Sequence, residues 1–324
     1  MYIVTGGAGF IGSNIIKGLN QSGISDILVV DNLQKSEKFK NLTSLQFADY
    51  RDKETFIRAI RKENVPNDIS AIFHQGACSD TMEYDGRYMM DNNYEYSKAL
   101  LHFALERRVP FIYASSAAVY GTSQVFTEAA INEKPLNIYG YSKLLFDRYV
   151  SRIFPEVEST IVGLRYFNVY GPGEDHKGRM ASMVHQLCRQ LQTTGKARLF
   201  RGTGGYGDGE QRRDFVSVDD IVAINLHFAK GPMQKGVYNV GTGQCRSFND
   251  VARNCIDQLG IGEIEYVDMP ATLMDKYQNY TQADISRLRE AGFCDEMTSL
   301  EKGIARFVGG LRGDDQSGLE VRLA

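Results

Sequence analysis

The sequence lacks any cysteine pattern that would mark a metal site or a disulfide framework. A structural zinc site needs closely paired ligands, and a disulfide framework needs an even number of half-cystines. The cysteines here are odd in number, scattered and without a CxxC pair: Cys78, Cys188, Cys245, Cys255 and Cys294. We therefore expect reduced, mostly structural cysteines and no metal site.

Long apolar runs and a surplus of positive charge are also missing. No run approaches the roughly 18 residues that a membrane span needs. The opening MYIVTGG has neither the charged segment nor the cleavage site of a signal peptide. The formal net charge of -3 and the isoelectric point near 6.0 give no general attraction to nucleic acid or anionic membranes. We expect a soluble cytoplasmic protein with neither nucleic acid nor membrane as partner.

The residues that are present form an alternating pattern in the first half of the 324-residue chain. Short β-branched runs alternate with longer segments in which apolar residues recur every three or four positions. The expected strands span 2–5, 26–31, 45–49, 70–74, 110–115 and 160–166, and the expected helices span 89–108 and 136–154. This alternation predicts an α/β fold with a Rossmann-type, doubly wound parallel sheet.

The second half predicts a smaller α/β substrate lobe that is interwoven with the first. After residue 172 the pattern loosens into glycine-rich loops, and it returns as a strand at 237–241 and a helix that begins at Phe248. We expect residues 1–172, with parts of 214–245, to form the nucleotide-binding domain, and residues 173–213 and 246–310 to form the substrate lobe. The final stretch, 311–324, has no clear period, and we expect a flexible tail there.

A glycine-rich turn, TGGAGFIG, follows the first expected strand and opens a helix. The turn contains three spaced glycines, Gly6, Gly9 and Gly12. Such glycines permit a tight turn and let backbone N–H groups approach a pyrophosphate at the positive end of the helix. Phe10 and Ile11, at the helix start, are expected to lie against the cofactor. Asp31 closes the second strand and completes the fingerprint of a dinucleotide site.

The residues after Asp31 leave the form of the cofactor open. Asp31 alone favours a ribose 2′-hydroxyl and therefore NAD. Three lysines that follow could instead neutralise a 2′-phosphate: Lys35, Lys38 and Lys40. The residue chemistry therefore predicts a nicotinamide dinucleotide without deciding between NAD and NADP.

A serine, a tyrosine and a lysine form the candidate catalytic centre. Ser116 follows the strand at 110–115, and the segment NIYGYSK, residues 137–143, opens the next helix. Tyr139 and Lys143 are one helical turn apart and share a face, whereas Tyr141 points elsewhere and is assigned to packing. We expect the ammonium of Lys143 to lower the pKa of Tyr139, and Ser116 to bind the same substrate oxygen.

The glycine turn and this triad together resemble the extended short-chain dehydrogenase/reductase family, over roughly residues 1 to 310. Further matching segments are HQGA at 74–77, Asn92, RYFNVYGP at 165–172 and RRDFVSVDD at 212–220. The resemblance implies that the first two contact the cofactor and that Arg213 meets a substrate diphosphate. Dehydratases of the family carry an Asp–Glu pair where this chain has Ala117 and Ala118, which favours an epimerase over a dehydratase.

The segment GPGEDHKGRMAS, residues 171–182, separates the chain from simple UDP-hexose epimerases. By residue chemistry alone, a loop lysine such as Lys177 is usually a surface charge. Together with MMDNNYEYSK, FHQGACS and YTQADISRLREAGF, however, the segment is similar to family members that invert C6 of an ADP-linked heptose with NADP. The resemblance implies that Tyr139 and Lys177 are the two acid/base groups, supported by Ser116 and Lys143. To accept a proton, Lys177 must be neutral part of the time, so we expect a desolvated site or a neighbouring cation.

The resemblance also implies which residues hold the two ligands. Besides the glycine turn and Asp31, the expected cofactor contacts are Asn32, Lys38, Lys53, Gln75, Gly76, Ala77, Cys78, Ser79, Asn92, Lys143 and Val169. The expected substrate contacts are Ser116, Asn168, Arg179, Gln186, Phe200, Arg201, Gly202, Thr203, Arg213 and Tyr277. Two departures lie in the substrate lobe: Arg179 replaces an expected small residue, and GGYGDGEQR lengthens the loop before Arg213.

Two other functions remain open at this stage. One is a UDP-hexose 4-epimerase that uses NAD, and the other is a non-catalytic regulator that senses a dinucleotide. Such regulators typically lose the tyrosine or the lysine, and both are present here. The resemblance further implies a homo-oligomer, a pentamer in some members, that acts in the cytoplasm in building the inner core of lipopolysaccharide.

Overall fold

The computed structural model describes residues 1–62, 65, 68–270 and 277–312. Its largest sheet has seven parallel strands in the order β10-β6-β5-β4-β1-β2-β3. These are β1 (Tyr2–Thr5), β2 (Ile27–Asp31), β3 (Asp49–Asp52), β4 (Ala71–His74), β5 (Phe111–Ser116), β6 (Ile161–Tyr166) and β10 (Lys235–Val240). The strand order reverses between β1 and β4, and open α/β sheets bind ligands beyond the strand ends at such a point.

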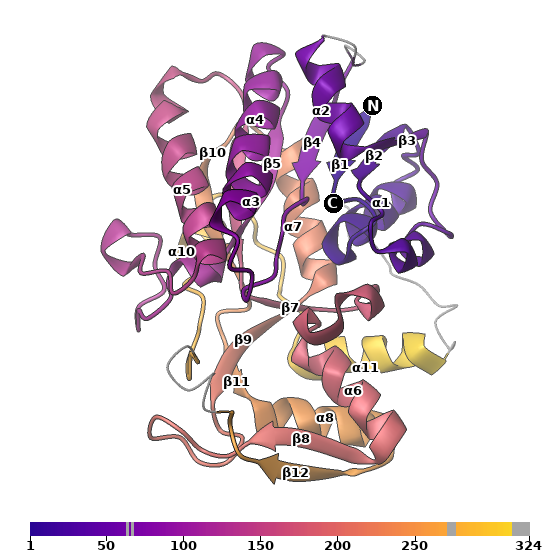
Figure 1. The fold of residues 1–324 in the computed structure, drawn as a ribbon, viewed down its shortest axis with the longest axis vertical. Helices are drawn as coiled ribbons and strands as arrows, with labels where there is room; N and C mark the ends of the chain where they lie inside the picture. The colour runs from indigo at the N-terminus through magenta and orange to yellow at the C-terminus, as the bar shows by residue number, and fades with distance from the viewer. Residues whose placement is uncertain (63–64, 66–67, 271–276, 313–324) are drawn as a thin grey trace.

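Helices cover both faces of this sheet (Figure 1). One face carries α1 (Phe10–Gln21) and α7 (Val218–Lys230), and the other carries α2 (Lys53–Arg61), α4 (Tyr96–Glu106) and α5 (Ile138–Ile153). Successive strand residues point to opposite faces, so Ile3 joins the core under α2, α4 and α5 while Val4 joins the core under α1 and α7. Both faces are buried, which explains the continuous apolar runs of the strands.

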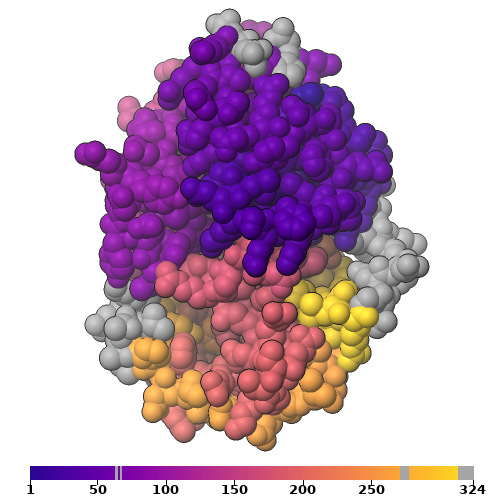
Figure 2. Space-filling model, turned by 45° about the vertical axis from the view of Figure 1, so that its right-hand side comes forward, coloured from indigo at the N-terminus to yellow at the C-terminus, as the bar shows by residue number. Residues whose placement is uncertain are grey.

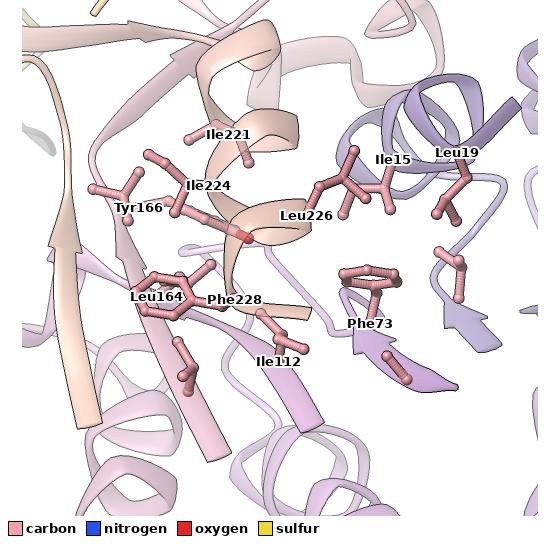
Figure 3. Close-up of a cluster of buried hydrophobic side chains, with 14 of the residues drawn as sticks. Ile15, Leu19, Phe73, Ile112, Leu164, Tyr166, Ile221, Ile224, Leu226 and Phe228 are labelled. Carbon is pink, nitrogen blue, oxygen red and sulfur yellow. The ribbon is translucent and has the colours of Figure 1, made fainter. Parts of the chain in front are cut away.

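The core under α1 and α7 is shown in Figure 3. Ile15 and Leu19 of α1 and Ile221, Ile224 and Phe228 of α7 point toward the apolar side chains of the central strands. Gly18 of α1 lets the two helices approach closely, since a Cβ there would lie 2.4 Å from a methyl group of Val222. This packing holds the start of α1, and therefore the glycine turn, at one end of the sheet.

A smaller lobe is built from residues of the second half; it lies below the sheet in Figure 1 and below the indigo N-terminal part of the chain in Figure 2. Its strands are β7 (Asn168–Tyr170), β8 (Lys196–Phe200), β9 (Arg212–Ser217), β11 (Cys245–Ser247) and β12 (Glu263–Val267), paired as β11-β9-β7 and β12-β8. Its helices α6 (Met183–Thr194), α8 (Phe248–Leu259) and α11 (Leu300–Arg312) enclose a core of their own. β7 follows directly after β6 of the main sheet and pairs with β9 of the smaller lobe. The chain therefore passes from one lobe into the other at this point.

The remaining elements are short. They are α3 (Gly86–Met90), α10 (Ser286–Glu290), a π-helical turn η2 (Asp91–Glu95), and the 3-10 turns η1 (Ser36–Asn41), η3 (Ala117–Val119), η4 (Ala130–Asn132), η5 (Phe154–Glu156) and η6 (Asp175–Met180). Across the described ranges, no helix is both long enough and apolar enough to cross a bilayer.

The structure confirms the predicted α/β fold and corrects several elements. The third strand is Asp49–Asp52 rather than 45–49, because this edge strand pairs only with β2 and its residues are polar. The helix predicted at 89–108 begins at Gly86 and is interrupted by the π-helical turn. The region after residue 172, predicted as glycine-rich loops, contains α6, β8, β9 and α7.

The predicted lobe boundaries remain a proposal. Among the elements of 214–245, β10 is a strand of the main sheet and α7 packs on that sheet. In contrast, β9 pairs with β7 and β11. Of the expected tail, Leu311 and Arg312 belong to α11. Residues 313–324 lie outside the described residues.

Candidate active site

The glycine turn between β1 and α1 is closed to side chains. Gly6 has a φ of +66°, and a Cβ there would lie 2.6 Å from the backbone nitrogen of Gly76. A Cβ on Gly12 would lie 2.2 Å from the carbonyl oxygen of Gly6. Gly9 is the N-cap and supplies no side-chain cap to α1, which begins at Phe10. The backbone can therefore approach a pyrophosphate at the positive end of the helix, and the turn fits a dinucleotide.

Asp31 is buried at the end of β2, where its carboxylate accepts hydrogen bonds from backbone nitrogens and pairs with a lysine. Its Oδ2 accepts a hydrogen bond from the backbone nitrogen of Ala8 at 3.0 Å, and its Oδ1 accepts one from the backbone nitrogen of Asn32 at 2.7 Å. The ammonium of Lys38 pairs with the same Oδ1 and lies 3.2 Å from Oδ1 of Asn32. A ribose bound here would meet a cation as well as a carboxylate.

Two other predicted cofactor residues meet near the π-helical turn. The ammonium of Lys53 donates to Oδ1 of Asn92 at 2.6 Å. The adjacent Asn93 is buried and clamps Cys78, accepting from its nitrogen at 2.8 Å and donating to its carbonyl at 2.9 Å. The π-helical turn thus fixes the loop that leaves β4, and π-helical turns are frequent at functional sites.

The loop after β4 contains the predicted residues 75–79. His74, the last residue of β4, shares hydrogen bonds with Oγ1 of Thr5 at 2.6 Å and with Oγ of Ser97 at 2.8 Å. Burial, together with the charge of Lys143, lowers the pKa of His74 to about 3, so the ring is neutral. Oε1 of Gln75 accepts from the hydroxyl of Tyr166 at 3.1 Å. Gly76, Ala77 and Cys78 are half-buried, and Ser79 is exposed.

Ser116 and Tyr139 are brought together as predicted. Ser116 ends β5, and Tyr139 lies in the first turn of α5, whose N-cap Asn137 accepts from the nitrogen of Gly140 at 2.8 Å. Burial raises the pKa of Tyr139, and its hydrogen bond with Ser116 partly opposes this. The expected lowering by Lys143 is therefore wrong for the protein alone. Tyr141 is exposed, so it does not pack in the core.

Lys143 is buried on the same helix, and its ammonium donates to the carbonyl oxygen of Ala114 at 2.7 Å. Burial lowers its pKa to about 8, while the carboxylate of Asp147, one turn further along α5, raises it. Asp147 is in turn held by Arg165 at 2.9 Å and by the hydroxyl of Ser115 at 2.8 Å. The ammonium is therefore bound to the strand that carries Ser116.

Lys177 lies in η6 with less than a quarter of its side chain exposed. Its ammonium is 3.3 Å from Oε2 of the buried Glu174 and 5.0 Å from the centroid of the Phe10 ring. It is therefore held at the start of α1 and is no freely solvated surface charge. Of the two surroundings expected for Lys177, a desolvated site or a neighbouring cation, the structure shows a largely buried side chain, and the group that pairs with it is a carboxylate.

Arg213 is a buried cation with no carboxylate partner among the described residues. Its guanidinium donates to the carbonyl oxygens of Arg212 and Gln278, and it lies 5.1 Å from the ring centroid of Tyr277 and 5.6 Å from that of Phe248. Burial lowers its pKa. Buried charges are normally paired, so this uncompensated charge can receive an anion such as a diphosphate.

The other predicted substrate residues belong to the same lobe. Phe200 packs edge-on against Tyr277, and the loop at 202–210 is pinned by the nitrogen of Gly202, which donates to Asp208 at 2.8 Å. Thr203 shares a hydrogen bond with Asn279 at 3.0 Å, whereas Arg201 is exposed and pairs with Asp208 and Asp268. Gln186 is bonded to the carbonyl oxygen of Ala181, Asn168 is exposed, and Val169 is half-buried.

Arg179, one of the two departures, forms an ion pair with Asp80 at 2.9 Å. This pair joins η6 to the loop that follows β4. It is exposed, and exposed ion pairs contribute little to stability. The contact nevertheless places the guanidinium of Arg179 beside the loop that follows β4.

Sequence reasoning missed the residues that support the site. Glu174 and Asn93 contact predicted site residues directly, and Asn41 donates to the carbonyl oxygens of Ala8 and Gly173 at 3.1 Å each. Nothing in the sequence distinguishes these positions from other polar residues. The segment 171–182, which contains Glu174, resembles the corresponding segment of related epimerases, but that resemblance indicates a role for Lys177 alone.

Comparison with known proteins agrees with this geometry. Residues 2–241 match the model of the NAD dependent epimerase/dehydratase family. The chain is 55% identical over 309 residues to an ADP-L-glycero-D-manno-heptose-6-epimerase of Alkalilimnicola ehrlichii, which covers 95% of this chain and 96% of the relative. It is 51% identical over 321 residues to that of Thiobacillus denitrificans, which covers 94% and 97%.

Solved structures agree as well. The ADP-L-glycero-D-manno-heptose-6-epimerase of Helicobacter pylori superimposes with a TM-score of 0.84 and 33% identity, covering 96% of both chains. A UDP-glucose 4-epimerase of Thermus thermophilus, solved with NAD, has a TM-score of 0.78 and 27% identity, covering 96% of this chain and 99% of that one. The family match and these structures indicate a nicotinamide dinucleotide cofactor. The chain therefore belongs to the NAD dependent epimerase/dehydratase family.

Proposed function

We propose that this protein converts ADP-D-glycero-β-D-manno-heptose to ADP-L-glycero-β-D-manno-heptose by inverting C6. The full-length similarity to two curated heptose epimerases supports this substrate. The observation that carries the mechanism is the position of Lys177, which is held at the start of α1 rather than in bulk water. A second acid/base group is thus available on the cofactor side of the site.

The chemistry is a transient oxidation and re-reduction of C6. The nicotinamide supplies and receives the hydride when the cofactor is bound. Inversion needs proton transfer on both faces of the reacting carbon, so two groups are required. Tyr139 and Lys177 are these groups: one accepts the hydroxyl proton and the other returns a proton to the ketone oxygen after its face is exchanged.

The supporting residues orient these two groups. Ser116 bonds to Tyr139, and its proposed role is to bind the same substrate oxygen. Lys143 keeps a cation close to the strand end, and Arg213 offers its buried charge to the diphosphate of the sugar nucleotide. Electrostatic groups that are fixed before the reaction stabilise developing charge without reorganisation.

We further infer that the cofactor is NADP. The ammonium of Lys38 already pairs with the carboxylate of Asp31, so the carboxylate that would repel a 2′-phosphate is partly neutralised. Lys53 supplies a second cation beside Asn92. The same proposal includes a cytoplasmic homo-oligomer, a pentamer by family resemblance, that supplies the inner core of lipopolysaccharide.

The experiment that tests the function compares two substrates. The purified protein is incubated separately with ADP-heptose and UDP-galactose, and the configuration at C6 or C4 is followed by NMR. Inversion of the heptose alone is expected. Inversion of UDP-galactose at C4 would instead favour a UDP-hexose 4-epimerase, the activity named for the Thermus thermophilus structure. Release of the cofactor by denaturation and its identification distinguishes NADP from NAD.

A further inference from the structure

We propose that Glu174 is a positioning residue that holds the ammonium of Lys177 at the start of α1 and releases it to the substrate. The inference rests on the role proposed above for Lys177. It concerns a carboxylate that would not touch the substrate itself.

Glu174 is fully buried, and its carboxylate is surrounded by hydrogen-bond donors. Oε1 accepts from the hydroxyl of Ser182 at 2.6 Å and from the nitrogen of Gly171 at 3.4 Å. Oε2 accepts from the nitrogen of Ser182 at 2.7 Å and from the ammonium of Lys177 at 3.3 Å. A buried ionised carboxylate is costly unless it is paired and hydrogen-bonded, and this one is both.

The distances divide these contacts into two kinds. The two bonds to Ser182 are short, whereas the contacts with Lys177 and with the nitrogen of Gly171 are 3.3 and 3.4 Å long. If the ammonium moves toward a substrate, three donors remain on the carboxylate. The buried carboxylate would then keep its hydrogen bonds but lose its ion pair, which favours the return of the ammonium to the same place.

The backbone around Glu174 is fixed to the nucleotide side of the site. Asn14 of α1 donates to the carbonyl oxygen of Pro172 at 2.9 Å, and Asn41 links the carbonyl oxygens of Ala8 and Gly173. On the other side, Ser182 is the N-cap of α6 and accepts from the nitrogen of His185 at 3.2 Å. Glu174 thus lies where the glycine turn, Lys177 and the smaller lobe are joined.

A purely structural role is the competing explanation, in which Glu174 only supports the start of α6 through Ser182. The two roles differ in their dependence on Lys177. A positioning residue loses its effect on turnover when Lys177 is absent, whereas a structural residue retains it. A double-mutant cycle measures this dependence.

The experiment compares kcat, KM and bound cofactor for the wild type, Glu174→Gln, Lys177→Met and the double variant, using ADP-heptose. Glutamine is close in shape and can still bond to Ser182, but it has no charge to hold the ammonium. We expect Glu174→Gln to lower kcat by about 10²-fold, the scale of a misplaced catalytic group, with KM and cofactor content near those of the wild type. In the Lys177→Met background the same change should have little further effect.

The matched control is Glu95→Gln, which removes the carboxylate of another Glu–Lys pair at the same i,i+3 spacing, between Glu95 and Lys98 at 2.9 Å. Wild-type turnover is expected there. If Glu174→Gln does not fold, Glu174→Asp is used. The aspartate side chain is shorter by one carbon–carbon bond, about 1.5 Å, so its carboxylate cannot contact Ser182 and Lys177 together.

Two results would overturn the proposal: wild-type kcat in a folded Glu174 variant, or an equal loss with and without Lys177. Failure of the proposed function looks different. In that case Lys177→Met itself would be fully active, or the heptose would not be inverted by the wild type.

Discussion

Lys143 donates a hydrogen bond from its buried ammonium to the carbonyl oxygen of Ala114 at 2.7 Å. Burial lowers the pKa of this lysine to about 8, and the nearby carboxylate of Asp147 opposes that shift. The lysine proposed to support Tyr139 is therefore a charge held where its charged form is disfavoured. Such sites are common at active centres, where stability is given up for function.

This burial predicts a pH-dependent stability. Between the folded pKa of about 8 and the ordinary value of 10.5, the unfolded chain binds more protons than the folded chain. Stability from this group therefore rises with pH in that window, and the penalty below pH 8 is about 3 kcal/mol. We expect Lys143→Met to gain relative to the wild type at pH 7 and to lose that advantage by pH 10.5.

Urea unfolding of the cofactor-free proteins at a series of pH values measures this difference. Both proteins contain the same cysteines and tyrosines, so the titration of those groups cancels in the comparison. Parallel stability curves for the two proteins would show that Lys143 does not titrate in this window.

Removal of either proposed acid/base group should abolish most of the turnover. General acid–base groups contribute about 10²- to 10⁴-fold, so Tyr139→Phe and Lys177→Met are each expected to lower kcat within that range. Cofactor content should stay near that of the wild type, because the glycines of the turn and the contacts of Asp31 are unchanged. Tyr141→Phe is the control, since Tyr141 is exposed two residues away on the same helix. Full activity in either variant would remove that residue from the mechanism.

Lys38 should determine the preference for NADP over NAD. A hydrogen bond to a charged group contributes about 1.5–3 kcal/mol, so Lys38→Met is expected to weaken NADP binding by roughly 10- to 100-fold. Affinity for NAD should change little or improve, because Asp31 is freed from its ion pair with Lys38.

Titration calorimetry of the cofactor-free protein with each dinucleotide gives both constants. Lys40→Met is the matched control, since Lys40 belongs to the same 3-10 turn but is exposed. Equal losses for NADP and NAD in Lys38→Met would contradict a contact with the 2′-phosphate.

Arg213 should be required for substrate binding, and its buried charge should lower the stability of the substrate-free protein. Its buried guanidinium has no carboxylate partner in the described part of the chain, and replacing an uncompensated buried charge by an apolar side chain is often neutral or stabilising. We expect Arg213→Met to match or exceed the wild-type melting temperature while KM rises at least tenfold, by analogy with the loss of a charged hydrogen bond.

Arg212→Met serves as the control, because the neighbouring Arg212 is exposed and its guanidinium contacts the sulfur of Cys245. It should leave both the melting temperature and KM near the wild-type values. A large loss of stability in Arg213→Met, with KM unchanged, would assign the arginine to structure.

Much of the architecture was accessible to sequence reasoning because it depends on local patterns. Strands buried on both faces need consecutive apolar residues, and β1, β2, β4, β5 and β6 carry them. The edge strand β3 is polar and half-exposed, so it gives no apolar signal, and the sequence pattern predicts the strand at the nearby run 45–49 instead. The smaller lobe was underestimated because its strands are short and broken by glycine-containing loops.

By itself, the sequence determined the Rossmann-type sheet, the glycine turn and the one-turn spacing of Tyr139 and Lys143, since each of these depends on residues that are close along the chain. Only the tertiary structure decided where the ammonium groups are held. Lys143 faces Ala114, Lys177 lies between Phe10 and Glu174, and Arg213 has no carboxylate partner within the described ranges. These positions depend on burial and on contacts between different segments of the chain, such as Ala114 with Lys143 and Phe10 with Lys177. No local pattern encodes such contacts.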